Sequence, residues 1–389
     1  MHTEESRVQS SRIEDQSAGD LHKSMWHSVR RSRADIDAVT DGGGFLWAIA
    51  LFFAPTSLLA GGWSVETWSV PFDYESESSI TEYLPAQPAS KRWHLCIAYP
   101  HLKDSYWLNV NYGMLEEAKR LGIAFTLVEA GGYPNVERQR QQIEECTGQG
   151  ADALVVGTVS FEGLTNTLET IARKMPVLAT VNDIDDRAIA AKSGVSWTSM
   201  GRVVGEYLAR KHPRGSESVD VAWFPGPTGA GWVYFIEEGF RQGLGDSAVN
   251  VVVTKWGDTG KEIQRTLVQE VLESHADVDY FVGNALMAEA AISTLRNRGL
   301  EQKIHIVSTY FTPAVYRGIR RGRILAAPTD APVVQGRLSI NQAVRILEGR
   351  PFAKHVGPAI VMVDQDNWRD TKIADSLAPP SFLPTFKWP

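Results

Sequence analysis

The chain has 389 residues, 43% of them hydrophobic and 22% charged, which is the composition of a globular protein long enough for two domains. Its formal net charge of −7 leaves no basic surplus for binding a phosphate backbone, so we expect no nucleic acid partner. With two cysteines, the chain can form neither a disulfide-rich scaffold nor a structural zinc site built from clustered thiolates.

The first apolar segment, residues 45–60, has the features of an export signal. It is broken by Pro55 and is shorter than the roughly 20 apolar residues that a membrane-spanning helix needs. Arginines precede it and small residues follow it, so we predict a signal peptide that is cleaved near Ala60 and a periplasmic location. An uncleaved membrane anchor remains the alternative, and the sequence leaves open whether translation starts at Met1 or Met25.

The folded body is predicted to begin near Trp93, after an irregular arm at 61–90 that lacks clear periodicity. From there, short apolar runs alternate with amphipathic stretches, a pattern typical of βαβ units around a parallel sheet. We expect a first doubly wound lobe with strands at 94–100, 124–130, 153–159 and 176–182, and helices at 110–122, 135–150 and 161–175.

A second set of elements of the same kind follows, and it predicts a second Rossmann-like lobe. Its helices are expected at 200–212, 231–243, 263–275 and 286–299, and its strands at 219–226, 250–257, 279–284 and 303–310. The remaining elements, at 315–322, 324–330, 333–349 and 359–365, suggest that the chain crosses between the lobes several times. Ligands of open α/β sheets bind at the carboxyl ends of strands, so the cleft between the lobes is the expected site.

Collinear segments of this chain resemble the TorT-type members of the type I periplasmic binding protein family, notably HLCIAYPHLKDSYWLNVNYGMLEEAKRLG at 94–122 and EAGGYPNVERQRQQIEEC at 129–146. The resemblance covers nearly all of 93–365. It implies two Rossmann-like lobes joined by a three-stranded hinge, with the ligand in the inter-lobe cleft and no cofactor. The implied boundaries are 1–60 for the extension and signal peptide, 61–90 for the arm, 91–197 with 310–352 for the first lobe, 198–309 with 353–372 for the second, and 373–389 for a C-terminal tail.

The same resemblance implies a function. TorT-type proteins bind trimethylamine N-oxide and partner the periplasmic domain of a TorS-type sensor histidine kinase that controls trimethylamine N-oxide respiration genes. The same fold also serves as the substrate-binding component of ABC transporters, which is the alternative for a small methylated amine or another small solute. An enzyme would need a nucleophile with a base, a metal or paired carboxylates, and neither these nor a metal-binding spacing of histidines stands out.

Trimethylamine N-oxide carries partial positive charge on its methyl groups, and such a group is bound by a cage of aromatic rings. Five rings follow predicted strands or lie at predicted crossovers, where the two-lobed fold would bring them together; each ring taken alone could equally be core. These first candidates are Tyr106, Trp107, Tyr133, Trp197 and Tyr310. Asp104 either supplies negative charge near the methylated nitrogen or caps the following helix. Second candidates are Trp232, Tyr234 and Asn284.

The two cysteines, Cys96 and Cys146, lie in a predicted strand and near the end of a predicted helix. A disulfide requires their Cα atoms to lie within about 7 Å of each other. The sequence does not determine that distance, so a bridge and two free thiols are both compatible with it.

Overall fold

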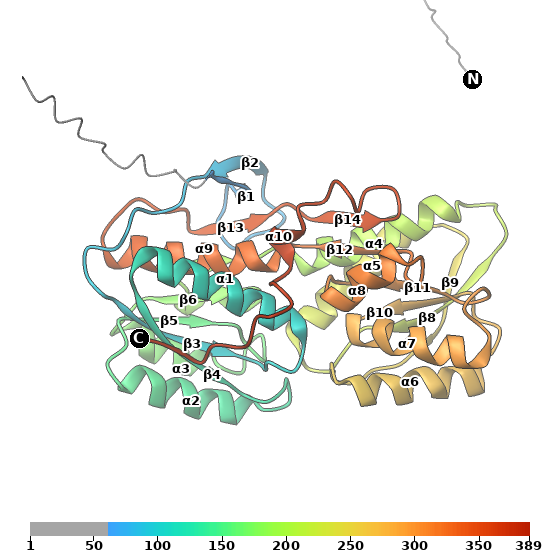
Figure 1. Ribbon diagram of the computed structural model, residues 1–389, viewed down its shortest axis with the longest axis horizontal. Coiled ribbons are helices and arrows are strands. Elements are labelled where there is room, and N and C mark those ends of the chain that lie inside the picture. The colour runs from blue at the N-terminus through green and yellow to red at the C-terminus, as the bar shows by residue number, and fades with distance from the viewer. Residues whose placement is uncertain (1–60) are drawn as a thin grey trace, which may run out of the picture. The chain divides into compact units, whose positions relative to one another are not determined.

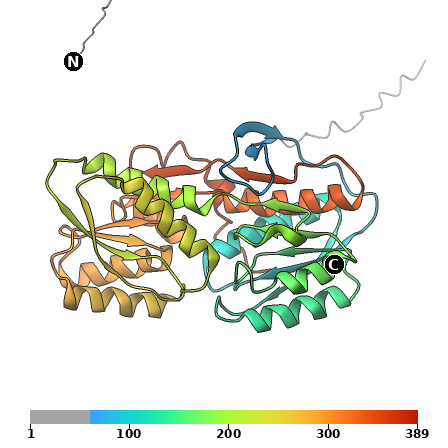
Figure 2. The ribbon, with the colours of Figure 1, turned by 180° about the vertical axis from the view of Figure 1, so that it is seen from behind.

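The computed structural model describes residues 61–389, and the predicted export signal lies outside the described residues. The described part contains two β-sheets, each with helices packed on it (Figure 1; the opposite side is in Figure 2). None of its helices combines the length and the apolar character that crossing a membrane requires. The α/β class and the two-lobed arrangement predicted from the sequence are confirmed.

The first lobe is built on a nine-stranded sheet. Its central strands are almost wholly buried apolar runs, as expected for parallel strands covered on both faces. The helices of this lobe are α1 (Ser105–Leu121), α2 (Val136–Gly148), α3 (Thr165–Ala172) and α9 (Pro332–Leu347). The strand order is β15 (Lys387–Trp388), β4 (Ala124–Glu129), β3 (His94–Tyr99), β5 (Ala153–Val156), β6 (Val177–Thr180), β7 (Ala191–Ser193), β13 (His355–Pro358), β1 (Trp63–Trp68) and β2 (Ser78–Tyr83).

The second lobe is built on a six-stranded sheet. Its strand order is β14 (Val361–Asp364), β12 (Ala326–Thr329), β11 (His305–Ser308), β10 (Tyr280–Gly283), β8 (Val219–Phe224) and β9 (Val249–Thr254). Its helices are α4 (Trp197–Lys211), α5 (Gly231–Leu244), α6 (Lys261–Ser274), α7 (Ala285–Arg298) and α8 (Pro313–Arg320).

Helices α4 and α5 pack with their backbones in contact, because glycines lie along their interface. A Cβ atom added to Gly239 would lie 1.8 Å from the carbonyl oxygen of Thr198, and one added to Gly201 would lie 2.0 Å from that of Ile236. Larger residues are therefore excluded at both glycines. This close approach also brings together the N-terminal turns of the two helices, which carry two of the candidate rings.

The chain passes between the sheets three times, at 193–197, 329–332 and 358–361. Three crossings agree with the predicted hinge, but the predicted boundaries of 310–352 and 353–372 are wrong. Strand β12 pairs with β11 and β14 in the second sheet, so the second lobe extends to about residue 329. Strand β13 pairs with β7 and β1, which places it in the first lobe.

The arm at 61–90 is not irregular as predicted, because it contains the β1–β2 hairpin. Strand β1 pairs antiparallel with β13, next to the third crossing, and so extends the first sheet. Strand β2 is exposed along most of its length, which removes the apolar alternation that would have revealed it. The tail at 373–389 is likewise structured: α10 (Ile373–Ser376) is followed by β15, which pairs with β4.

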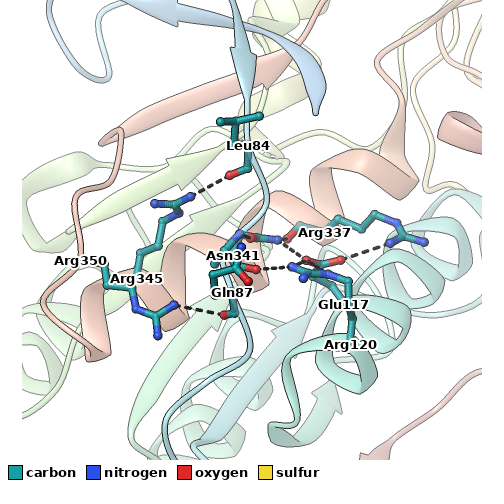
Figure 3. Close-up of polar contacts among 9 residues, drawn as sticks. Leu84, Gln87, Glu117, Arg120, Arg337, Asn341, Arg345 and Arg350 are labelled. Carbon is teal, nitrogen blue, oxygen red and sulfur yellow. Dashed lines mark hydrogen bonds and ion pairs between the residues drawn. The ribbon is translucent and has the colours of Figure 1, made fainter. Parts of the chain in front are cut away.

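A buried ionic network joins α1 to α9 (Figure 3). The carboxylate of Glu117, on α1, is completely buried. It accepts hydrogen bonds from Arg120, from the amide of Asn341 at 2.6 Å, and from Arg337 at 3.2 Å. Both oxygens of this carboxylate therefore have partners.

Arginines of the same region hold the segment that links the hairpin to β3 (Figure 3). Arg345 donates to the carbonyl oxygen of Leu84 at 2.7 Å, and Arg350 donates to that of Gln87 at 3.1 Å. The hairpin is thus attached to the first lobe through both its strand pairing and its connecting segment.

The structure places a disulfide between Cys96 of β3 and Cys146 of α2, with a Cα–Cα distance of 5.9 Å. The bridge closes a loop across 50 positions of sequence, which on a chain-entropy estimate stabilises the fold by about 4 kcal/mol. Such a bridge is typical of a protein that folds in an oxidising compartment.

Candidate functional site

A small cavity lies where the two lobes meet. Every residue that lines it is buried. Six lining residues come from the first lobe and four from the second: His101, Asp104, Tyr106, Trp107, Tyr133 and Asn182, and Trp197, Trp232, Thr259 and Tyr310.

A larger crevice lies beside the first crossing, but its walls are of a different kind. Its walls include charged side chains such as Asp186 and Arg187, which are exposed to solvent. Such a crevice suits solvated charges better than a small solute without net charge.

The first-lobe residues reach the cavity from the carboxyl ends of β3, β4 and β6. Helix α1 begins five residues earlier than predicted, so Tyr106 and Trp107 lie in its first turn rather than in a loop. Asp104 is the N-cap of this helix, and its Oδ1 accepts a hydrogen bond from the backbone N–H of Tyr106 at 2.9 Å. The cap fixes the start of the helix and thereby the placement of both rings.

The second-lobe rings are placed by helix starts and a strand end. Trp197 is the first residue of α4, which is capped by the hydroxyl of Ser196. Trp232 lies in the first turn of α5, and the close packing of α4 against α5 puts the two indole centroids 5.1 Å apart. Tyr310 follows β11.

Four of the rings form a closed box drawn from both lobes. Tyr106 lies 5.6 Å from Tyr310 between centroids, Tyr310 lies 6.3 Å from Trp232, and Trp197 completes the circuit at 6.4 Å from Tyr106. Two further rings extend the box: Trp107 contacts Tyr106 at 6.0 Å, and Tyr133 contacts Trp232 at 5.9 Å.

Three of these rings have their polar atoms bonded to other groups of the protein. The hydroxyl of Tyr106 donates to Asp330 at 2.6 Å, and that of Tyr310 donates to Oδ2 of Asp104 at 2.6 Å. The indole N–H of Trp197 donates to the carbonyl of Val181 at 3.3 Å. Fixed in this way, the three rings can offer a ligand their faces but no free donor.

Three other lining residues retain polar atoms without an acceptor in the described part of the chain. The indole Nε1 of Trp232 and the Nδ1 of His101 are buried without any partner. The hydroxyl oxygen of Tyr133 accepts from Asn182 at 3.3 Å, which leaves its proton available. The cavity therefore combines ring faces with donors that lack an acceptor, which suits a solute having an apolar, positively polarised surface and one strong acceptor.

Two titratable groups set the charge of the cavity. Burial raises the pKa of Asp104 to about 6, against the opposing effect of hydrogen bonds from the Tyr106 backbone and the Tyr310 hydroxyl. Burial lowers the pKa of His101 to about 4, so this imidazole is neutral near pH 7. At that pH Asp104 is the anionic group of the cavity, and the structure shows that it both caps α1 and faces the site.

The cavity brings together the five first-candidate rings, Asp104 and Trp232, but it does not include Tyr234 or Asn284. Tyr234 is 54% exposed, and its hydroxyl accepts from the backbone of Gly229. Asn284 caps α7 by accepting from the N–H of Met287, and its amide donates to the carbonyl of Phe224. These two second candidates lie outside the cavity, whereas the third, Trp232, lines it.

Sequence reasoning missed three lining residues: His101, Asn182 and Thr259. They follow β3, β6 and β9, so the strand-end rule that selected the rings could also have selected them. They were missed because the search for a cage favoured aromatic residues. Among residues 61–389, no group of three or more His, Cys, Asp or Glu side chains is placed to hold a metal ion.

Comparisons with known proteins agree with this architecture. The "Periplasmic binding protein domain" model matches residues 95–351. The "Periplasmic protein TorT" of Escherichia coli strain K12 is 40% identical over 301 residues, which cover 77% of this chain and 85% of that protein.

Two solved structures are similar over most of the chain. One is described as an ABC transporter solute binding protein from Bradyrhizobium sp. BTAi1 with bound bis-tris; it is 47% identical, with a TM-score of 0.73, and the match covers 84% of this chain and 98% of that one. The other, a TorS sensor domain–TorT complex in the presence of TMAO, is 41% identical, with a TM-score of 0.71, and the match covers 76% and 99%. The chain belongs to the periplasmic binding protein family and has the two-lobed α/β fold of its type I members.

Proposed function

We propose that this protein is a periplasmic solute-binding sensor that binds trimethylamine N-oxide between its lobes, without catalysis, and signals to a TorS-type histidine kinase controlling trimethylamine N-oxide respiration. The observation that carries the proposal is the closed box of four rings, contributed by both lobes, with unpaired donors beside it. The relatives named TorT support the same solute and partner.

The chemistry of the solute matches both the aromatic faces and the hydrogen-bond donors that line the cavity. Each electron-rich ring face attracts a methylated, positively polarised nitrogen by about 0.5–2 kcal/mol, with the larger values at dry sites. The N-oxide oxygen is a strong acceptor, and Trp232 and Tyr133 hold donors that no described protein group accepts. The anionic Asp104 adds attraction for the polarised nitrogen.

Signalling follows from where the site lies. Hydrogen bonds and an ion pair cross the cleft beside the cavity: Tyr310 to Asp104 at 2.6 Å, His101 with Thr259 at 3.2 Å, and Lys103 with Asp258 at 2.5 Å. A solute that contacts rings from both lobes stabilises this closed arrangement over open ones. A partner that contacts one arrangement better than the other then responds to the solute.

Isothermal titration calorimetry of the exported protein with trimethylamine N-oxide tests solute binding. We expect one site per chain, strong loss of binding in Trp197→Leu, and no change in Tyr234→Ala, which removes an exposed ring outside the cavity. Absence of binding heat in the wild type at any practical concentration would refute the proposed ligand.

Delivery to an ABC transporter is the second candidate function, and the 47% identical structure described as an ABC transporter solute binding protein favours it. The partner separates the two functions. Co-elution of this protein with a TorS sensor domain, measured with and without trimethylamine N-oxide, supports sensing. Failure to co-elute in both conditions, with solute binding intact, would instead support transport.

A further inference from the structure

His101 occupies an unusual position for a histidine that is neutral. It lines the cavity from the first lobe, is buried, and has an Nδ1 atom with no partner in the described part of the chain. Its other ring nitrogen, Nε2, lies 3.2 Å from the hydroxyl of Thr259, which belongs to the second lobe. The histidine therefore contacts both the cavity and the opposite lobe.

A neutral imidazole carries its proton on only one of its two nitrogens. If the Thr259 hydroxyl donates to Nε2, the proton lies on Nδ1, and His101 becomes a hydrogen-bond donor to a solute in the cavity. If Nε2 donates to the hydroxyl instead, Nδ1 is a lone pair that repels the oxygen of an N-oxide. The hydroxyl of Thr259 has no other partner among the described residues, so it is free to take the first role.

We propose that His101 donates a hydrogen bond from Nδ1–H to the N-oxide oxygen. Thr259 is then a positioning residue, because its hydroxyl selects this tautomer of His101 only when the lobes are closed. The inference rests on the proposed solute. It makes recognition of the oxygen depend on closure, because the group that orients the imidazole belongs to the other lobe.

The surroundings of His101 are consistent with this role. Its ring packs edge-on against Tyr133 at 5.3 Å, and Tyr133 packs against Trp232 at 5.9 Å. His101 thus lies next to two side chains, Tyr133 and Trp232, that each have a polar hydrogen available. The methyl groups face the remaining rings, whose polar atoms are bonded elsewhere.

Two ligands separate oxygen recognition from cage packing. Tetramethylammonium has nearly the shape of trimethylamine N-oxide but carries a methyl group in place of the acceptor oxygen. We expect His101→Leu to weaken trimethylamine N-oxide binding about tenfold, the loss of one hydrogen bond in a dry site, and to change tetramethylammonium binding less than threefold. His101→Asn, whose amide reaches the place of Nδ1, should restore most of the affinity.

Thr259 has its own pair of variants. Thr259→Val should reduce binding of trimethylamine N-oxide severalfold, and Thr259→Ser should retain it, because serine keeps the hydroxyl. The control is Thr126→Val, since Thr126 pairs with His94 at 3.0 Å in the first sheet, away from the cavity. This control should leave the affinity for both ligands unchanged.

Nitrogen-15 NMR of the wild-type protein saturated with trimethylamine N-oxide reports the tautomer directly. The proposal predicts a protonated Nδ1 and an unprotonated Nε2 for His101. The opposite tautomer, or an equal loss of both ligands in His101→Leu, would overturn the inference while leaving the solute assignment intact. A wild-type protein that does not bind trimethylamine N-oxide would refute the proposed function instead.

Discussion

Two buried polar clusters of this protein differ in how many of their polar atoms have hydrogen-bond partners. Around Glu117, arginines and an asparagine from α1 and α9 contact both carboxylate oxygens (Figure 3). In the cavity between the lobes, Trp232 and His101 instead retain buried polar atoms without partners.

The difference separates structural from functional polarity. Buried polar groups are normally hydrogen-bonded, so an unpaired one calls for an explanation. Such a group alone does not mark a site, since the indole of Trp223 is unpaired inside the second lobe, where it stacks on Phe240. What distinguishes the cavity is that unpaired donors, open space and rings from both lobes coincide there.

The largest effect is expected from breaking the satisfied cluster. Glu117→Ala leaves two arginines and an amide without their shared carboxylate, and we expect a loss of about 2–3 kcal/mol in unfolding free energy, since the arginines can partly turn to water. Thermal or urea denaturation measures this loss. The affinity of the folded variant for trimethylamine N-oxide should stay within about twofold of wild type. Since a tenfold change in affinity corresponds to about 1.4 kcal/mol, this is a difference in binding free energy of under about 0.5 kcal/mol. A large loss of affinity would mean that the two clusters are coupled.

The next largest effect is expected from removing an unpaired donor of the cavity. Trp232→Phe keeps a ring in the box but removes the unpaired indole N–H, and we expect about tenfold weaker trimethylamine N-oxide binding with little loss of tetramethylammonium binding.

Trp223→Phe is the matched control, because it removes an indole N–H that is equally unpaired but lies outside the cavity. It should leave the affinity for both ligands unchanged. Equal effects of the two variants on calorimetric binding would show that unpaired indoles carry no information about the ligand.

A severalfold effect is expected from pH through Asp104, whose pKa burial raises from 3.8 to about 6. The folded protein holds this proton more tightly than the unfolded chain does. The contribution of Asp104 to apo-protein stability is therefore fully present below pH 3.8 and is lost as the pH rises through 6.

A positively polarised solute favours the ionised carboxylate, so trimethylamine N-oxide affinity should rise severalfold between pH 5 and 7, and by no more than the roughly tenfold rise in the ionised fraction for a pKa near 6. Calorimetry across this range, with Asp104→Asn as the comparison, measures the effect. A variant with the same pH profile as wild type would exclude Asp104 as its cause.

The smallest effect is expected at the rim of the cleft. Lys103 and Asp258 form an ion pair across the lobes, and the lysine is partly exposed. Lys103→Ala should weaken solute binding by no more than about threefold, since exposed pairs contribute about 0–1 kcal/mol, and added salt should reduce the difference from wild type. The charge-swapped double variant Lys103→Asp with Asp258→Lys should recover most of the affinity.

Local patterns in the sequence predicted the parts of this fold that depend on local structure. Rings that follow strands, such as Tyr133 after β4 of the first sheet and Tyr310 after β11 of the second, meet in the cavity because residues beyond the carboxyl ends of strands in both sheets line it. We predicted the start of α1 too late in the chain. The two aromatic residues that follow the cap at Asp104 were interpreted as part of a binding loop, although they lie in the first turn of the helix.

Contacts between segments that are distant in the chain could not be predicted from the sequence. That β12 joins β11 in the second sheet, rather than returning to the first lobe, depends on pairing between distant segments. The contact of His101 with Thr259 likewise joins residues 158 positions apart, and nothing near either residue signals it. The exposed strand β2 gave no alternation to recognise, because both of its faces are exposed along most of its length.

A crystal structure of the exported protein with trimethylamine N-oxide tests the account most directly. We predict that the nitrogen lies inside the box formed by Tyr106, Trp197, Trp232 and Tyr310, with the oxygen within 3.2 Å of a donor on His101, Tyr133 or Trp232, the upper limit of an ordinary N–H hydrogen bond. Density for the solute outside this box, or an oxygen directed at Asp104 and away from all three donors, would contradict the account.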